Sequence, residues 1–257
     1  MLNLNKEGFV LENYHKNTVI GEFSGRDSVA AILKAYEDGV DYILPIATFA
    51  GTEYGNFDSI TENYLKLKNR VDSLYGDKKK LYPLLEHNDE KLWHLLNGRF
   101  ASVLQSKYNF YNPCIGCHLY FHVTKLKYAN GLSKRIISGE RESHDGKLKV
   151  NQLHETLEVY KSVLKSLGFE LLMPLQDMFE GEEVKRLIGW DWAEGKDHPK
   201  CVMSGNYRNL NGKAIFNFDD LNTFLERYIK IIGVTAGQYV LGEVSFEALT
   251  QKIKDVL

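Results

Sequence analysis

The sequence predicts an α/β fold in which a parallel five-stranded sheet is covered by helices on both faces. Short apolar runs of strand length alternate with segments whose apolar residues recur at helical spacing. Each intervening helix has about ten or more residues, which suits the crossover that joins two parallel strands. Beyond residue 205 only helical patterns follow. We therefore expect a main domain over 1–205 and a small helical C-terminal appendage over 206–257.

Each expected element has a local signal in the sequence. The strands are short and rich in apolar residues, and the fourth of them ends in a glycine loop. The expected strands are 17–23, 41–50, 80–87, 135–140 and 169–175. Gly39 is placed to end the expected helix 27–37, and Gly168 is placed to end the expected helix 151–167. The expected helices are 27–37, 58–74, 88–106, 113–128 and 151–167, and in the appendage 217–232 and the last fifteen residues.

Composition and charge narrow the class of protein. Of the 257 residues 44% are hydrophobic and 26% are charged, as in an ordinary globular chain with a sizeable core. The net charge of −2 argues against a polyanion binder that works through overall charge. No basic-then-apolar leader and no run near the roughly 18 apolar residues of a membrane span is present. We expect a cytoplasmic protein without membrane partners, in which three cysteines do not form a disulfide framework.

The loop after the first expected strand has the composition of an anion site. Ser24, Gly25, Arg26, Asp27 and Ser28 lie where a parallel sheet and the following helix present free backbone N–H groups. Gly25 permits close approach of an anion, and the serines and Arg26 add donors and charge. The competing interpretation is a helix cap made by Ser24 or Asp27. Neither GxxxxGK[ST] nor GxGxxG occurs in the chain.

This loop resembles the SGGxDS loop of the PP-loop (N-type) ATP pyrophosphatases, with one glycine where that family usually has two. The resemblance implies an adenine nucleotide α-hydrolase-like, Rossmann-like fold that binds ATP and Mg²⁺ and releases pyrophosphate. Residues 24–28 would hold pyrophosphate, and Gly139 and Glu140 would form a second nucleotide loop. Glu140 or Asp145 would help to hold Mg²⁺. The end of the second strand would hold adenine through the backbone of Ala47, Thr48 and Phe49.

The cysteines form the second informative pattern. Cys114 and Cys117 make a CxxC at an expected helix start, where the helix N-terminus favours thiolates, and Cys201 stands alone. Four interpretations compete. A c-type haem attachment requires export, and a thioredoxin-like pair would follow the first strand of its fold. Zinc could be held by the three cysteines with His118 or His122. A [4Fe–4S] cluster on the three cysteines would leave one iron open.

Cysteine order adds a second resemblance. A subset of PP-loop enzymes that thiolate tRNA carries a CxxC after the third strand and a lone cysteine after the fifth, and here Cys201 follows Cys117 by 84 positions. The resemblance implies an ATP-dependent sulfurtransferase with Asp27 and the three cysteines as catalytic residues. It would adenylate a carbonyl oxygen and replace that oxygen with sulfur. The expected partners are ATP, a tRNA base or small-molecule acceptor, a sulfur donor and a second copy of the chain in a homodimer.

Two alternatives from other classes stay open. One is a PP-loop ligase or amidase-type enzyme with structural zinc. The other is a nucleotide-binding module without catalysis, in which the shortened loop reflects lost pyrophosphatase activity.

Overall fold

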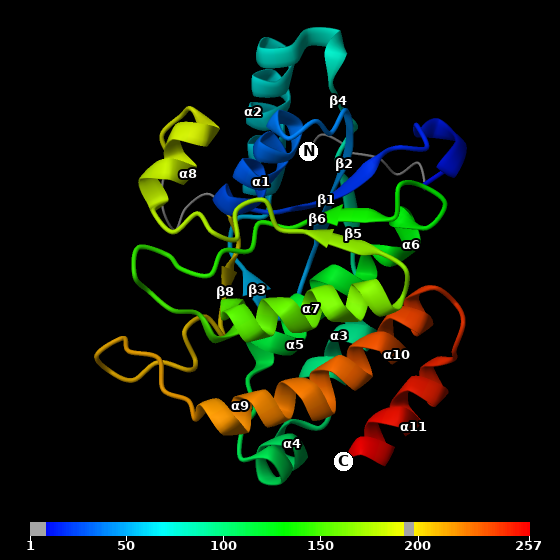
Figure 1. Ribbon diagram of the computed structural model, residues 1–257, viewed down its shortest axis with the longest axis vertical. Helices are drawn as coiled ribbons and strands as arrows, with labels where there is room; N and C mark the ends of the chain where they lie inside the picture. Colours follow the sequence, from blue (N-terminus) through cyan, green and yellow to red (C-terminus); the bar gives the residue numbers. More distant parts are fainter. Residues whose placement is uncertain (1–8, 193–197) are drawn as a thin grey trace.

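A parallel sheet lies at the centre of the computed structural model, which describes residues 9–192 and 198–257. The strands run in the order β4-β2-β1-β6-β7, and β5 pairs with β2 beyond β4. The predicted fold class is therefore confirmed (Figure 1). The strands are β1 Val19–Phe23, β2 Tyr42–Thr48, β4 Lys80–Leu81, β5 Leu85–His87, β6 Arg135–Ile137 and β7 Glu170–Leu172.

The third expected strand, 80–87, is divided into two segments. Both β4 and β5 pair with β2 in parallel, and residues 82–84 separate them. Pro83 has no backbone N–H and so cannot donate to a ladder, which accounts for the interruption. The strands β2, β6 and β7 end two or three residues before the predicted ends, because residues such as 138–140 leave the sheet to form loops, whereas β1 ends at Phe23 as predicted.

One face of the sheet is covered by three helices. Val29, Ile32 and Leu33 of the first helix are fully buried against Ile43 of β2, so a continuous apolar stripe drives this layer. Gly39 has φ +96°, a conformation that glycine adopts without strain, and the predicted helix stop is confirmed. The helices of this layer are α1 Arg26–Glu37, α2 Asp58–Tyr75 and α8 Gly181–Ile188.

The opposite face is covered by a thicker helical layer. Its apolar side chains form one cluster with Ile20, Leu44 and Ile136 of the sheet. The expected helix 88–106 is two helices, because the chain turns between Gly98 and Phe100. The helices of this layer are α3 Glu90–Asn97, α4 Ala101–Tyr108, α5 Pro113–Thr124, α6 Leu126–Ala129 and α7 His154–Ser166.

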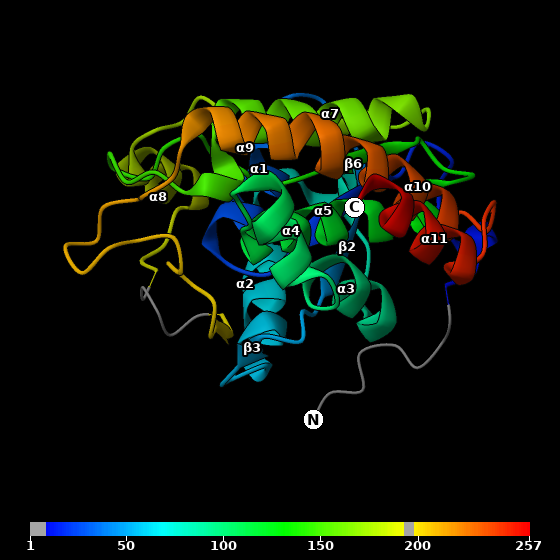
Figure 2. The ribbon, with the colours of Figure 1, turned by 90° about the horizontal axis from the view of Figure 1, so that it is seen from below.

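The C-terminal helices pack on this same layer. Figures 1 and 2 both show α10 running alongside α7, and Gly233 of α10 lies against Val163 of α7. Leu225 and Ile232 belong to the same apolar cluster as the sheet residues. The boundary near residue 205 stays a prediction. The helices are α9 Phe218–Phe224, a π-helical stretch Leu225–Ile229, α10 Lys230–Val240 and α11 Phe246–Val256.

A small antiparallel pair stands apart from the main sheet. It joins β3 Glu53–Tyr54 to β8 Lys200–Cys201, with Glu53 opposite Cys201. The pairing carries Cys201 back to the segment that leaves the carboxyl end of β2. No helix among the described residues is both long enough and apolar enough to cross a bilayer.

Candidate functional site

Residues 24–28, which join β1 to the first turn of α1 and are called the anion loop, form one wall of a cavity of about 550 Å³. Ser28 shapes this loop: its hydroxyl accepts a hydrogen bond from the Ser24 N–H (2.9 Å) and donates to the Gly25 carbonyl (2.7 Å). Asn63 of α2 donates to the Ser24 carbonyl from the other side (3.2 Å). Helix geometry leaves the N–H groups of the first turn of α1 without intrahelical acceptors. These N–H groups, rather than the Ser28 hydroxyl, are the natural anion donors.

The second loop, after β6, lies directly against the first. A Cβ on Gly139 would come within 2.7 Å of the Asp27 carbonyl carbon and of the Ser28 nitrogen. No side chain fits at this position, so glycine is required for the two loops to meet. Both loops line the same cavity, as the two resemblances to nucleotide loops require.

A partly buried carboxylate, Glu22, and a buried one, Glu140, share one histidine at the cavity floor. His122, on α5, is fully buried and its Nδ1 lies 2.7 Å from Glu22 Oε1, while its Nε2 lies 3.7 Å from Glu140 Oε1. Burial alone would lower the pKa of His122, but the two carboxylates raise it above its ordinary value. Burial likewise opposes ionisation of Glu140, but His118 and His122 lower its pKa to about 2. The floor therefore holds charged groups in compensating pairs.

Lys125 completes the floor. It is buried at the end of α5, where Nζ donates to the Phe121 carbonyl (3.2 Å) and to the Thr48 hydroxyl. Burial lowers the pKa of Lys125 to about 8, although the charge of Glu22 acts in the opposite direction. Thr48, the last residue of β2, and Lys125 both line the cavity.

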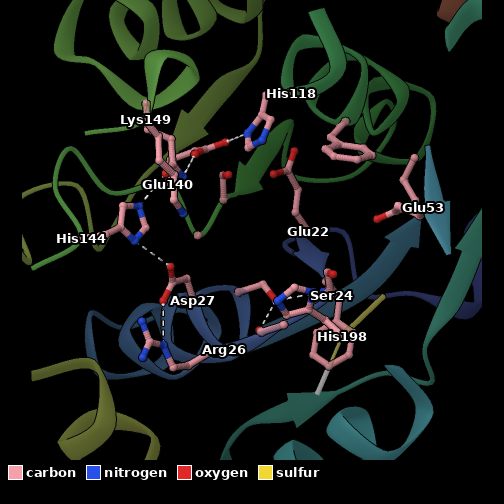
Figure 3. Close-up of a pocket in the computed structure, with 18 of the residues that line it drawn as sticks. Glu22, Ser24, Arg26, Asp27, Glu53, His118, Glu140, His144, Lys149 and His198 are labelled. Carbon is pink, nitrogen blue, oxygen red and sulfur yellow. Dashed lines mark hydrogen bonds and ion pairs between the residues drawn. The ribbon is translucent and has the colours of Figure 1, made fainter. Parts of the chain in front are cut away.

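A chain of hydrogen bonds and ion pairs runs from the anion loop to His118 (Figure 3). Asp27 Oδ2 lies 3.6 Å from His144 Nδ1, and His144 Nε2 lies 2.5 Å from Gln152 Oε1. Gln152 in turn donates to Glu140, whose other oxygen lies 2.5 Å from His118 Nδ1. Glu140, His144 and Gln152 all lie in the segment between β6 and α7, so the chain depends on how this one segment packs against Asp27 and His118.

The three cysteines line a second cavity, of about 670 Å³. Cys114 and Cys117 come from the first turns of α5, and Cys201 comes from β8. All three are free thiols and half-buried. Among residues 9–192 and 198–257 there is no group of three or more His, Cys, Asp or Glu side chains placed to hold one metal ion.

The expectation that the helix start favours thiolates is wrong for this environment. Burial is the largest effect on both thiols of the CxxC. It raises the pKa of Cys114 to about 11, with the neighbouring Cys201 as the next cause. It raises the pKa of Cys117 still further, against a hydrogen bond from Trp93 that lowers it. A positively charged partner is therefore needed to make these sulfurs anionic, and a soft metal centre is such a partner.

The two cavities are adjacent and share part of their lining. Glu53, His118 and Phe121 line both, as do the cationic side chains at the rim. A ligand bound at the anion loop and a group held by the cysteines would face each other across this shared wall. The shared residues are Glu53, His118, Phe121, Lys147, Lys149 and His198.

Most of the residues expected from the sequence line these two cavities. Ala47 is instead fully buried in the core, and Phe49 packs on Phe57; neither residue lines either of these two cavities. Asp145 lines the first cavity, and its Oδ1 accepts the Gly181 N–H (2.7 Å). The expected residues in the first cavity are Ser24, Gly25, Arg26, Asp27, Ser28, Thr48, Gly139 and Glu140, and those in the second are Cys114, Cys117 and Cys201.

Several residues of the site had not been expected. Glu22 could have been noticed, because a carboxylate inside an apolar strand is unusual and needs a partner. Lys125 ends an apolar helix and carries the same signal. Trp93, Gln152 and Lys149 have no local signal, because their roles depend on contacts between distant segments.

Gly116, inside the CxxC, allows α3 to approach α5. A Cβ at this position would overlap Asn97 Oδ1 and would meet the Leu96 carbonyl at 3.4 Å. We expect Gly116→Ala to lower the free energy of unfolding by about 1–3 kcal/mol, because overpacking forces neighbouring groups apart. Denaturant unfolding of the metal-free protein measures this. Gly51→Ala is the control, because its Cβ would make only ordinary contacts with Trp93; equal stability of the two variants would contradict the prediction.

Helices on both faces of a parallel sheet, with a cavity beside the loops that follow β1 and β6, define the chain as an α/β protein with a Rossmann-like architecture. No protein-family model matches the chain. It belongs to the same family as the uncharacterized protein MJ0009 of Methanocaldococcus jannaschii, to which it is 41% identical over 214 residues, covering 83% of this chain and 77% of that protein.

Among solved structures, the fold is similar to that of a 4-thiouridine synthetase in a complex with RNA and bound ATP. The TM-score is 0.48 and the sequence identity 14%. The match covers 93% of this chain and 53% of the other, so the chain spans about half the length of that synthetase.

Proposed function

We propose that the protein is an ATP-dependent sulfurtransferase of the PP-loop type, which adenylates a carbonyl oxygen of its acceptor and exchanges that oxygen for sulfur. One observation carries the proposal: the anion loop and the three-cysteine cavity share a wall, so that an activated acceptor and a sulfur-bearing centre can meet. Either feature alone occurs in many other classes of protein. The acceptor we propose is a tRNA base.

The anion loop supports the first step. N–H groups of the first turn of α1 would bind the pyrophosphate end of ATP, and Arg26 and Lys149 add positive charge at the cavity wall. The acceptor oxygen would attack the α-phosphorus, and the bond to the β-phosphate oxygen would break. These donors would stabilise the charge that develops on pyrophosphate as it leaves.

Mg²⁺ would accompany ATP. The carboxylates nearest the loop already have partners, since Glu140 pairs with His118 and Asp145 accepts the Gly181 N–H. Asp27, in the loop itself, is paired with Arg26 (3.3 Å) and Arg141 (3.4 Å). We therefore propose that phosphate oxygens supply most of the ligands of Mg²⁺, an arrangement common for this ion.

Cys114, Cys117 and Cys201 would hold a [4Fe–4S] cluster. Three thiols on one cavity fit such a centre, because the ligands of a cluster bind different irons and need not converge on one point. When bound, the cluster would supply the sulfur atom at its fourth iron. His118 and Glu53, which face both cavities, would orient the acceptor carbon between the two. A carbon–sulfur bond would form as the bond to AMP breaks.

The test is anaerobic purification followed by measurement of iron, sulfide and zinc, and then incubation with ATP and bulk tRNA. We expect iron and sulfide in the ratio of a [4Fe–4S] cluster, loss of iron on Cys117→Ser or Cys201→Ser, and AMP with pyrophosphate as products that depend on tRNA. Zinc without iron would overturn the cluster and favour the ligase or amidase-type enzyme. Binding of ATP without release of pyrophosphate would favour a nucleotide-binding module.

A further inference from the structure

Trp93, on α3, makes a direct polar contact with one of the three cysteines. Its indole Nε1–H donates to Cys117 Sγ at 3.3 Å. An indole N–H can only donate, so the direction of this hydrogen bond is fixed and the sulfur is the acceptor. Asn97 donates to the Trp93 carbonyl (3.0 Å), which ties the tryptophan to the last turn of α3. The same asparagine abuts Gly116 of the CxxC, so α3 and α5 are locked together at this point.

The other two sulfurs also receive hydrogen bonds. The Met203 backbone N–H donates to Cys201 Sγ at 3.4 Å, and Asn206 Nδ2 donates to Cys114 Sγ at 3.8 Å. Every cysteine of the set is therefore placed as an acceptor of an N–H group. The contact from Trp93 is the shortest of the three. It is also better shielded, because Trp93 is half-buried whereas Asn206 is exposed.

Hydrogen bonds of this kind act mainly on sulfur that carries negative charge. A neutral thiol is a weak acceptor, whereas a metal-bound thiolate accepts a charge-assisted bond that is roughly twice as strong as a neutral one. Partners of this kind orient the ligands of a metal and tune its affinity and reduction potential. Cys114 and Cys201 also donate, to the Met203 carbonyl (3.9 Å) and to the Thr52 hydroxyl (3.2 Å), as neutral thiols do. Cys117 is recorded only as an acceptor, from Trp93, so its contact is the one that best matches an anionic sulfur.

We propose that Trp93 is a positioning residue for Cys117, which fixes the direction of its sulfur and stabilises the negative charge of that sulfur when a soft metal centre is bound. This inference rests on the proposed function only in taking the three cysteines as ligands. It applies to an iron–sulfur cluster and also to zinc, for which the three cysteines, not placed around one ion here, would have to draw together. It assigns a role to a residue outside the cysteine motif.

The test compares Trp93→Phe with Trp190→Phe in the full chain. Trp190 is a matched control because its buried indole nitrogen has no hydrogen-bond partner among the described residues and it lines neither of the two cavities. In protein reconstituted anaerobically with iron and sulfide, we expect Trp93→Phe to shift the reduction potential to a more negative value, because the reduced centre loses a donor. Trp190→Phe should leave the potential unchanged. In zinc-loaded protein, Trp93→Phe should weaken zinc binding about tenfold or more.

A measurement on the unsubstituted protein guards against misfolding of the variant. With ¹⁵N in the tryptophan rings, pulsed electron paramagnetic resonance of the reduced centre should detect coupling to one indole nitrogen, and the cadmium-loaded protein should show the same contact by nuclear magnetic resonance. If the centre binds but neither coupling nor variant effect is found, the role of Trp93 is wrong and the proposed function survives. If only zinc binds and Trp93→Phe weakens it, the cluster is wrong and the role of Trp93 survives. Failure of iron and zinc alike to bind overturns both.

Discussion

Replacing His122 by leucine is expected to lower the free energy of unfolding by about 3 kcal/mol, because removal of one partner from a buried ion pair leaves an uncompensated charge. His122 is fully buried and lies 2.7 Å from Glu22 and 3.7 Å from Glu140. The effect should fall at the lower end of the usual range, since Lys125 still faces Glu22 and His118 still bonds Glu140. Chemical denaturation at neutral pH measures the difference.

His154→Leu is the control for this variant. His154 also pairs with a carboxylate, with Nδ1 2.8 Å from Glu142 Oε1, but its side chain is 61% exposed. Exposed pairs are screened by water, so we expect a change of about 0.5 kcal/mol or less. Equal losses in the two variants would show that the buried position of His122 has no special importance.

The same pair predicts how stability depends on pH. The folded-state pKa of His122 is raised, so its contribution is complete below the unfolded value of 6.5 and is lost as pH rises through the folded value. The folded-state pKa of Glu140 is lowered to about 2, so its contribution is complete above 4.5 and is lost as pH falls toward 2. Both contributions are present between these limits. In the His122→Leu variant, the decrease in stability above pH 6.5 that deprotonation of His122 causes should be absent.

The arrangement of the sheet could be predicted because its signals are local. Apolar runs marked the strands, and Gly39 and Gly168, both at positive φ, marked helix stops. Where the prediction differs in detail, a local cause overrides the apolar pattern, as at Pro83 between β4 and β5. The common cavity of the three cysteines was expected only from the resemblance in their order, and it is the pairing of β8 with β3, outside the main sheet, that brings Cys201 to it.

The charged floor could not be predicted because it depends on pairs far apart in the chain. Glu22 and His122 are separated by 100 positions, and Lys125 and Thr48 by 77. A lone histidine on an apolar helix face is compatible with a core, a ligand or an acid–base role. These three roles can be told apart only in the folded chain, where α5 packs against the ends of β1 and β6. The same reasoning applies to the thiols, whose burial outweighs the helix N-terminus in setting their pKa.

Gly139→Ala is expected to weaken nucleotide binding at least tenfold and to lower the free energy of unfolding by about 1–3 kcal/mol. The added Cβ would lie 2.7 Å from the Asp27 carbonyl carbon and the Ser28 nitrogen. These are backbone atoms of the anion loop, so relief requires the two loops to separate rather than a side chain to rotate. Separation would move the N–H groups of α1 away from the position where they converge on a phosphate, and small displacements of binding groups have large effects.

Calorimetric titration with inorganic pyrophosphate, and with an ATP analogue that cannot be cleaved, measures the loss of binding separately from the loss of stability. Loss of binding to both ligands would locate the effect in the anion loop itself. Gly51→Ala provides the matched control, because its Cβ would touch only the Trp93 ring at 3.4 Å and should leave pyrophosphate binding unaltered. Unchanged affinity of Gly139→Ala for pyrophosphate would mean that anions do not bind where the loops after β1 and β6 meet. The cavity lined by these two loops would then bind a ligand other than a phosphate group.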